Sequence, residues 1–226
     1  MLFSYNQNVA FSIMEPHPKS KQRYDEIAQW EPGTLPFSNT LGWSEWGLLG
    51  VLADFVLFFR REGCIVEIGV GESSIYLTKL AEKYGRKIFH CDISHGVITN
   101  YKSVKGYFAD NAHLFIGTSD DFFKETDIPT VALGFIDGGH MYEQVKRDFW
   151  NLFPLLVDNG YIFMHDTYPP HESWTHENAC GDGYKLRQEL ETMRDKMDCF
   201  TFAYSAIETG LTMVRKKPRN LPGCRR

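Results

Sequence analysis

The stretch "VEIGVGESS", Val66 to Ser74, decides the fold. It runs from an apolar, strand-like segment through two glycines into small polar residues that begin a helical pattern. Gly69 and Gly71 let something approach the backbone closely, and a strand that merely turns into a helix does not need both. The stretch therefore predicts either a nucleotide pocket or a tight corner, and the rest of the chain has to distinguish the two.

Apolar, strand-like runs alternate with helical patterns along the chain. Apolar residues at helical spacing predict a helix over about 44–61, before the glycine loop. Behind the loop the pattern predicts helices over 73–84, 142–156 and 184–197. The expected strands are the runs "CIVEIG", "KIFHCDI", "HLFIGTS", "VALGFIDG" and "YIFMHDT". This order of elements is typical of a parallel sheet covered by helices on both faces.

The last two strand-like runs follow a different pattern. "CFTFAYSA" and "GLTMVRKK" are joined by the short "IETG" and predict an antiparallel hairpin. Upstream, we expect a helix or an irregular crossover at about 96–108, a kink or restart of the long helix at Pro154, and a turn at "DNG" into the fifth strand. The predicted fold is an open, doubly wound, Rossmann-like α/β domain. Its seven-stranded, mostly parallel sheet ends in a C-terminal antiparallel hairpin.

Length and composition indicate one folded domain. The 226 residues are 43% hydrophobic and 15% aromatic, which is enough for one sizeable core. We assign residues 1–43 to an irregular N-terminal arm, 44–217 to the domain and 218–226 to a solvated basic tail. The net charge of −5 argues against a sequence-independent grip on nucleic acid. No apolar run approaches the roughly 20 residues of a membrane span.

The five cysteines are scattered and form no C-x-x-C pair. Reduced thiols are therefore expected, which favours a cytoplasmic location and argues against a structural zinc. The N-terminus lacks the basic start and apolar block of a signal peptide. Three roles stay open for the N-terminal arm: covering a site, exchange between the subunits of a homo-oligomer, or none.

Three aspartates follow predicted strands at the edge where ligands bind in such sheets: Asp92, Asp137 and Asp166. "GVGESS" approaches the dinucleotide fingerprint G-x-G-x-x-G, but it places Ser74 at the third glycine and so disfavours a bound pyrophosphate. A ligand without phosphate, such as an amino acid joined to a nucleoside, still fits against two glycines. Asp92 is then placed to accept hydrogen bonds from both ribose hydroxyls.

"VEIGVGESS", followed by "HCDIS", resembles the first two motifs of class I S-adenosylmethionine (SAM)-dependent methyltransferases. The terminal hairpin is similar to the last two strands of that fold, so the resemblance runs from about residue 44 to 217. Ser73 stands where the family often has its third glycine. The cofactor-binding residues that the resemblance implies are Glu67, Gly69, Gly71, Ser73, Asp92, Ser119 and Asp120. Among these, the glutamate and glycines line the methionine end, the first aspartate holds the ribose, and the last two residues lie beside the adenine.

The stretch "FIDGGHMYEQVKRDFWNLFPLLVDNGYIFMHDT" resembles a subgroup with D-G-x-H and H-D-T motifs, which includes macrolide-sugar and antibiotic-tailoring O-methyltransferases. Asp137 and Asp166, at adjacent strand ends, are oxygen ligands of the kind that Mg²⁺ prefers. Thr167 is expected to complete the metal site through its hydroxyl or carbonyl oxygen.

Methyl transfer to a hydroxyl needs a cation or a base, because a neutral hydroxyl is a poor nucleophile. Catechol-type methyltransferases, which are similar here, carry a base three residues after the first metal aspartate. That spacing selects His140, whose alternative role is to cap the following helix. His165, beside Asp166, is either an additional metal ligand, a second base or a structural residue. Strand alternation predicts that it points away from Asp166, which favours the structural role.

The predicted function is Mg²⁺-assisted, SAM-dependent O-methylation of a small hydroxylated acceptor, such as a sugar-like compound or a natural product. His140 and Asp137 are the predicted catalytic residues. One alternative is an NAD(P)-dependent oxidoreductase on the same architecture, and another is a non-catalytic cofactor-binding protein. A third takes "HCD", His90 to Asp92, as part of an iron site. The polar loop 171–184 is either an acceptor lid or an ordinary surface loop.

Overall fold

The computed structural model describes residues 45–60, 62–95, 110–203 and 209–218. The predicted N-terminal arm, the crossover at 96–108 and nearly all of the basic tail lie outside these residues. Within the described ranges, no helix is long and apolar enough to cross a membrane. The four cysteines of these ranges, Cys64, Cys91, Cys180 and Cys199, are free thiols.

A seven-stranded sheet forms the centre of the domain, with the strand order β3-β2-β1-β4-β5-β7-β6. The strands are β1 Cys64–Ile68, β2 Ile88–Asp92, β3 Ala112–Ile116, β4 Val131–Ile136, β5 Leu156–Met164, β6 Met197–Phe202 and β7 Leu211–Lys216. The first five strands are parallel to one another. Strand β7 runs antiparallel to both β5 and β6. The predicted fold class is confirmed.

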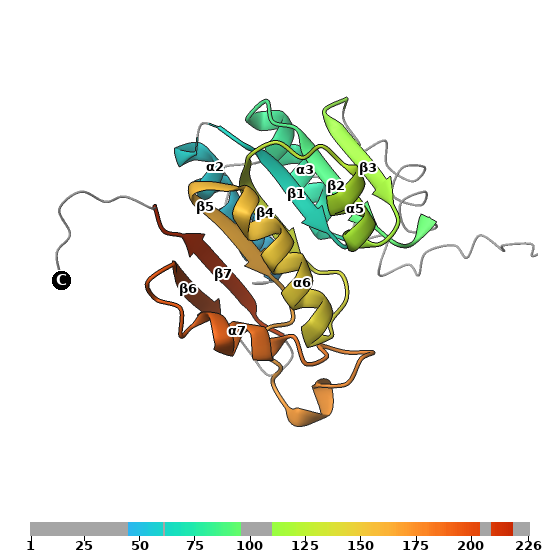
Figure 1. The fold of residues 1–226 in the computed structure, drawn as a ribbon, viewed down its shortest axis with the longest axis vertical. Coiled ribbons are helices and arrows are strands. Elements are labelled where there is room, and N and C mark those ends of the chain that lie inside the picture. The colour runs from blue at the N-terminus through green and yellow to red at the C-terminus, as the bar shows by residue number, and fades with distance from the viewer. Residues whose placement is uncertain (1–44, 61, 96–109, 204–208, 219–226) are drawn as a thin grey trace, which may run out of the picture.

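Helices cover both faces of this sheet (Figure 1). Helices α2 and α3 lie on one face, and α5, α6 and α7 lie on the other. The helices are α2 Glu45–Phe59, α3 Ser73–Lys83, α5 Ser119–Glu125, α6 Tyr142–Leu152 and α7 Tyr184–Leu190, with short 3-10 turns η1 Phe153–Leu155 and η2 Glu172–Trp174. Two apolar layers follow from this arrangement, one on each side of the sheet.

The alternation of side chains along a strand distributes residues between the two layers. In β1, Ile65 packs into the layer under α2 and α3, whereas Val66 packs into the layer under α5 and α6. Both side chains are fully buried. A strand buried on both faces reads as a continuous apolar run, which explains why "CIVEIG" lacks the alternation of a half-exposed strand.

Two helices differ from the sequence prediction, and the restart of the long helix at Pro154 agrees with it. Helix α5 was not expected; it begins after Thr118, whose hydroxyl accepts a hydrogen bond from the backbone N–H of Asp121. Helix α7 ends at Leu190 rather than at the predicted residue 197, and turns connect it to β6, which begins at Met197. The long helix ends at Leu152, and Pro154 lies in the 3-10 turn that follows, as a restart at this proline predicts.

The "DNG" segment is part of β5 rather than a turn in front of it. Strand β5 already begins at Leu156, which pairs with Val131. The register against β4 then shifts, so that Leu133 pairs with Tyr161. Asn159 has a φ of 60°, a left-handed conformation that asparagine tolerates better than most residues. The extra residues therefore form an irregularity within the strand.

The chain order reverses next to β1, which pairs with β2 on one side and β4 on the other. Ligands in open α/β sheets bind outside the carboxyl ends of the strands at such a switch point. The glycine loop follows β1, and the two polar loops that follow β4 and β5 lie at the same edge. The fold therefore predicts that a ligand binds at this edge of the sheet.

Candidate active site

The two glycines of the loop have different reasons to be glycine. Gly69 has a φ of +91°, and a Cβ at this position would collide with the backbone of Asp137 and Gly138. Its N–H donates to the carbonyl of Cys91 at 2.9 Å, so it joins three strand ends. At Gly71, a Cβ would meet no atom of the described residues within 4 Å other than those of its chain neighbours. Only Gly69 is therefore demanded by the packing of the protein itself.

Glu67 lies beneath the glycine loop and is fully buried. Its Oε1 accepts a hydrogen bond from Ser73 Oγ at 2.6 Å, and its Oε2 accepts one from Ser74 Oγ at 2.7 Å. His90 Nδ1 lies 2.5 Å from the same Oε2. The carboxylate therefore ties the first turn of α3 to β1 and β2. The structure places Glu67 and Ser73 under the loop, not among the residues that line the neighbouring pocket.

His90 is also part of this buried network. Its Nε2 lies 3.3 Å from the hydroxyl of Thr78, and its Nδ1 faces Glu67. Both ring nitrogens thus have partners in the interior, and the side chain is fully buried. The alternative of an iron site at "HCD" is not supported, since His90 is already engaged inside the protein.

A pocket of about 370 Å³ lies over the switch point. Its lining comes from the loops after β1, β2, β3 and β4 and from helix α6: Ile68, Gly69, Val70, Cys91, Asp92, Ile93, Gly117, Thr118, Ser119, Asp137, Gly138, Gly139, Gln144 and Asp148. The volume is within the range of small-molecule and cofactor sites. Four separate loops therefore converge on one cavity, as a cofactor site in this class of sheet requires.

Asp92 is fixed at the end of β2 by two backbone donors. Its Oδ2 accepts from the N–H of Val70 at 2.8 Å, and its Oδ1 accepts from the N–H of Ser94 at 2.6 Å. A carboxylate oxygen can accept more than one hydrogen bond, so both oxygens keep capacity for a ligand. The sequence prediction of Asp92 as a pocket residue agrees with its position in the lining.

The pocket lining also includes Ser119, Gln144 and Asp148. Gln144 Nε2 donates to Ser119 Oγ at 2.8 Å and to Asp148 Oδ1 at 3.0 Å. Asp120 lies outside this network: it is exposed and pairs with Arg147, whose Nε is 3.4 Å from Asp120 Oδ2. The structure brings Ser119 to the pocket but turns Asp120 towards the solvent.

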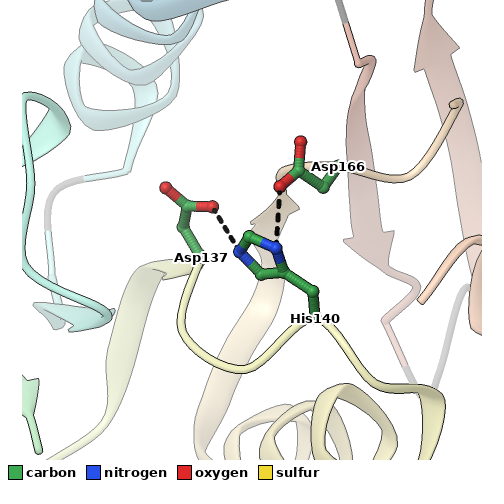
Figure 2. A group of neighbouring side chains, drawn as sticks. All are labelled: Asp137, His140 and Asp166. Carbon is green, nitrogen blue, oxygen red and sulfur yellow. Dashed lines mark ion pairs between the residues drawn. The ribbon is translucent and has the colours of Figure 1, made fainter. Parts of the chain in front are cut away.

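Asp137, His140 and Asp166 form a second polar cluster beside the pocket (Figure 2). The imidazole of His140 lies between the two carboxylates, with Nδ1 3.2 Å from Asp166 Oδ2 and Nε2 3.9 Å from Asp137 Oδ1. One potential ligand atom from each residue lies within 4.8 Å of the others, as a metal site requires. Asp137 belongs to both the cluster and the pocket lining. The two features therefore share one wall.

His165 lies at this cluster as well, which corrects the prediction that it points away. Its Nδ1 is 3.0 Å from Asp137 Oδ1 and 3.3 Å from Asp166 Oδ1. Strand β5 ends at Met164, and Asp166 has a φ of 56°, so the alternation of a regular strand no longer holds here. Two histidines and two aspartates consequently gather at this edge.

Asp166 is ionised more readily than an ordinary aspartate. Burial alone would raise its pKa, but the hydrogen bond and charge of His165, together with Thr209 and His140, outweigh burial and hold the pKa below its usual value. A buried carboxylate that stays charged at neutral pH is suited to bind a cation.

Both oxygens of Thr167 have partners within the protein. Its hydroxyl lies 2.7 Å from Thr212 Oγ1, and its carbonyl accepts a hydrogen bond from Arg187 Nε at 3.0 Å. The side chain is buried. The structure thus engages both oxygens that the sequence prediction assigned to a metal.

The loop around residues 176–184 packs against the cluster from below. His140 Nδ1 donates to the carbonyl of Ala179, and the N–H of Gly183 donates to the carbonyl of His140 at 3.0 Å. Asp182 Oδ1 accepts from the N–H of Tyr142, the first residue of α6, at 2.6 Å. Gly181 has a φ of +59°, and a side chain there would collide with His140. At least this part of the 171–184 loop therefore positions His140.

Comparison with known families gives a match over the centre of the chain. Residues 66–167, from β1 to the end of β5 and the cluster, match a family described as a methyltransferase domain. This range includes both polar networks and every loop that lines the pocket. A comparison with curated protein sequences gave no significant match.

Solved structures with the same fold include O-methyltransferases. An O-methyltransferase from Bacillus cereus, solved with S-adenosylhomocysteine (SAH), aligns with a TM-score of 0.62 and 15% identity over 91% of this chain and 94% of that one. TomG from Streptomyces achromogenes, involved in tomaymycin synthesis and solved with SAM, gives 0.61 and 14% over 92% and 93%. SAH-bound PaMTH1 from Podospora anserina gives 0.56 and 17% over 89% of each chain.

The seven-stranded α/β fold of this chain is the fold of these O-methyltransferase structures. The match to the methyltransferase-domain family covers residues 66–167, just under half of the chain. The fold that the resemblance of the glycine loop and of the D-G-x-H and H-D-T stretch implied is therefore confirmed.

The polar side chains that helix α6 contributes to the pocket were missed by sequence reasoning. Gln144 and Asp148 lie on α6, on its sheet-facing side, and not at a strand end. A signal was present: Asp148 occupies the helical face that also carries Val145, Phe149 and Leu152, which are all buried. An acid on the apolar face of a helix is uncommon and indicates a function or a buried partner.

Proposed function

We propose that this protein is a SAM-dependent O-methyltransferase acting on a small hydroxylated acceptor. The observation that carries the proposal is the shared wall between the pocket and the cluster. Asp137 lines the pocket and, with His140 and Asp166, forms the cluster of ionisable groups. A methyl donor in the pocket would thus present its reactive end to groups that can bind and deprotonate a hydroxyl.

The cofactor would lie across the switch point. Asp92 would accept hydrogen bonds from the ribose hydroxyls, and the open space above Gly71 would leave room for the ligand to pass close to the loop. Glu67 would act as a positioning residue, because it holds the loop from beneath. The SAM or SAH found in the B. cereus protein, TomG and PaMTH1 supports this cofactor.

His140 would act as the general base. A carbonyl can only accept a hydrogen bond, so His140 Nδ1 carries the proton in its bond to Ala179. In the neutral ring Nε2 is then unprotonated, and it faces the side of the cluster on which Asp137 lies. This nitrogen would take the proton of the acceptor hydroxyl as its oxygen attacks the methyl group of the sulfonium in a direct displacement.

The carboxylates of the cluster fit Mg²⁺. Mg²⁺ is often held by one or two carboxylates and several waters, and Asp137 and Asp166 provide two, of which Asp166 stays ionised. Bound there, Mg²⁺ would lower the pKa of an acceptor hydroxyl. Thr167 adds no ligand in this proposal, since both of its oxygens are engaged elsewhere.

A sugar-like compound or natural product is the acceptor class that we propose. The part that TomG plays in tomaymycin synthesis supports a natural product. The free thiols of the described cysteines are in keeping with a reducing compartment such as the cytoplasm.

The test is transfer of a labelled methyl group from SAM to a panel of catechols, sugars and natural-product phenols. We expect transfer to at least one acceptor, with strong losses in Asp137→Asn and His140→Gln. Glu143→Gln, an exposed carboxyl at the start of α6, is the matched control and should retain activity. Full activity of Asp137→Asn in the presence of a chelator would remove the metal from the proposal. Binding of SAH without transfer to any acceptor would favour a non-catalytic cofactor-binding protein.

A further inference from the structure

The carboxyl group of Asp148 lines the pocket with one oxygen unused. The residue is 0% exposed and lies on α6, one helical turn after Gln144. Its Oδ1 accepts the hydrogen bond from Gln144 Nε2. Its Oδ2 is buried and has no hydrogen-bond partner within the part of the chain that the structure describes. An acceptor without a donor is thus held at the pocket wall.

A buried acceptor without a partner lowers the stability of the protein unless a ligand donates a hydrogen bond to it. A buried polar group without a partner typically destabilises a protein by about 1–3 kcal/mol, and more when it is charged. Burial raises the pKa of Asp148 to about 6, although the Ser119 hydroxyl and the Gln144 amide lower it. Two neighbouring charges act in opposite directions: Asp120 raises the pKa of Asp148, and Arg147, which also contacts Asp120 and Gln144, lowers it.

The position of this carboxyl in the pocket indicates what it can meet. In the proposed binding mode, the methyl group of the cofactor lies beside Asp137 and the cluster, and the ribose lies beside Asp92. Asp148 is linked through Gln144 to Ser119, beyond the end of β3, in the remaining part of the lining. The base of a bound nucleoside would occupy that part.

We propose that Asp148 is the residue that selects adenine, with its Oδ2 accepting a hydrogen bond from the exocyclic amino group. Gln144 holds the carboxyl in place, because its amide nitrogen donates to Asp148 Oδ1 and to the hydroxyl of Ser119. The inference rests on the proposed function and adds a specificity-determining residue to it. It replaces Asp120, the neighbour expected from the sequence, which is exposed and paired with Arg147.

The relative affinity of the protein for adenine and hypoxanthine tests this proposal directly. They differ at one position, where adenine presents an amino donor and hypoxanthine a carbonyl acceptor. An ionised carboxyl accepts from the first and repels the second, so a buried carboxyl should discriminate by tenfold or more, on the order of 1.4 kcal/mol. Asparagine at position 148 has an amide nitrogen that can donate to the carbonyl of hypoxanthine. The preference for adenine over hypoxanthine should therefore weaken or reverse.

The experiment is calorimetric titration with SAH and with S-inosylhomocysteine, the same ligand with hypoxanthine as its base. The wild type should prefer SAH by about tenfold or more, and Asp148→Asn should lower that ratio by at least about tenfold. Glu143→Gln, exposed on the same helix, should keep the wild-type ratio. An unchanged ratio in Asp148→Asn, or a loss of selectivity in Asp120→Asn alone, would overturn the assignment.

A second measurement covers the case in which Asp148→Asn does not fold. In the wild type, the preference for SAH should fall as the pH is lowered through about 6, because protonation turns the acceptor into a donor. A ratio that stays constant through this pH range would refute the inference. If the wild type binds SAH but the ratio behaves otherwise than expected, only this inference fails. If it binds neither ligand, the proposed function fails first.

Discussion

Replacing Asp148 with asparagine should make the protein less sensitive to pH, and the structure gives the size of the effect. The carboxyl has a pKa of about 6 in the folded protein, against an ordinary value of 3.8, because burial disfavours its charged form. The folded protein therefore binds this proton more tightly than the unfolded chain. Stability from this group is fully present below the unfolded pKa and is lost as the pH rises through the folded one.

The magnitude follows from the difference of roughly two pKa units, each equivalent to about 1.4 kcal/mol. Between about pH 4 and pH 7, the wild type should lose about 2.4 kcal/mol of unfolding free energy through Asp148. Asparagine does not titrate. The free energy of unfolding of Asp148→Asn minus that of the wild type should therefore rise by about 2.4 kcal/mol over this range.

Urea-induced unfolding, followed by circular dichroism at several pH values, measures this difference. Other titrating groups contribute equally to both proteins and cancel, as long as the m-values agree. Glu143→Gln provides the baseline for an exposed carboxyl on the same helix. A difference between Asp148→Asn and wild type that stays flat from pH 4 to pH 7 would show that Asp148 is not held in a desolvated site.

Three further predictions concern the loop, its support and the cluster. Gly69→Ala should destabilise the protein by about 2 kcal/mol or more in denaturant unfolding, because its φ of +91° and the nearby backbone exclude a side chain. Gly71→Ala, where a Cβ has open space, should leave stability unchanged but weaken SAH binding in calorimetry. Glu67→Gln should lower the unfolding free energy by about 2 kcal/mol, since the amide group would face donors that the carboxylate now accepts from. Asp166→Asn should abolish Mg²⁺ binding in metal titrations while SAH affinity stays within about twofold, because Asp166 does not line the pocket.

Most of the fold could be predicted from the sequence, because its signals are local and repeated. Continuous apolar runs such as "CIVEIG" indicated buried parallel strands, and the two final runs indicated a hairpin. The missed helix α5 has only seven residues, so its helical period is scarcely visible. The irregularity in β5 depends on pairing with β4, and "DNG" alone has the composition of a turn.

The site was predictable in its place and less so in its contacts. The strand-end rule located Asp92, Asp137 and Asp166 at one edge, and the structure agrees. The same rule could not predict that the carboxylate of Glu67 points towards Ser73 and Ser74 of α3, because the direction of a side chain depends on its tertiary partners. His165 was misplaced because the regular strand ends one residue before it.

The central claim is that the pocket at the switch point binds the SAM scaffold. Calorimetric titration of the purified protein with SAH, and separately with NAD⁺, tests it most directly. We predict a dissociation constant on the order of micromolar for SAH, weakened in Gly71→Ala, and no binding of NAD⁺. Binding of NAD⁺ without SAH, or of neither ligand, would contradict the account.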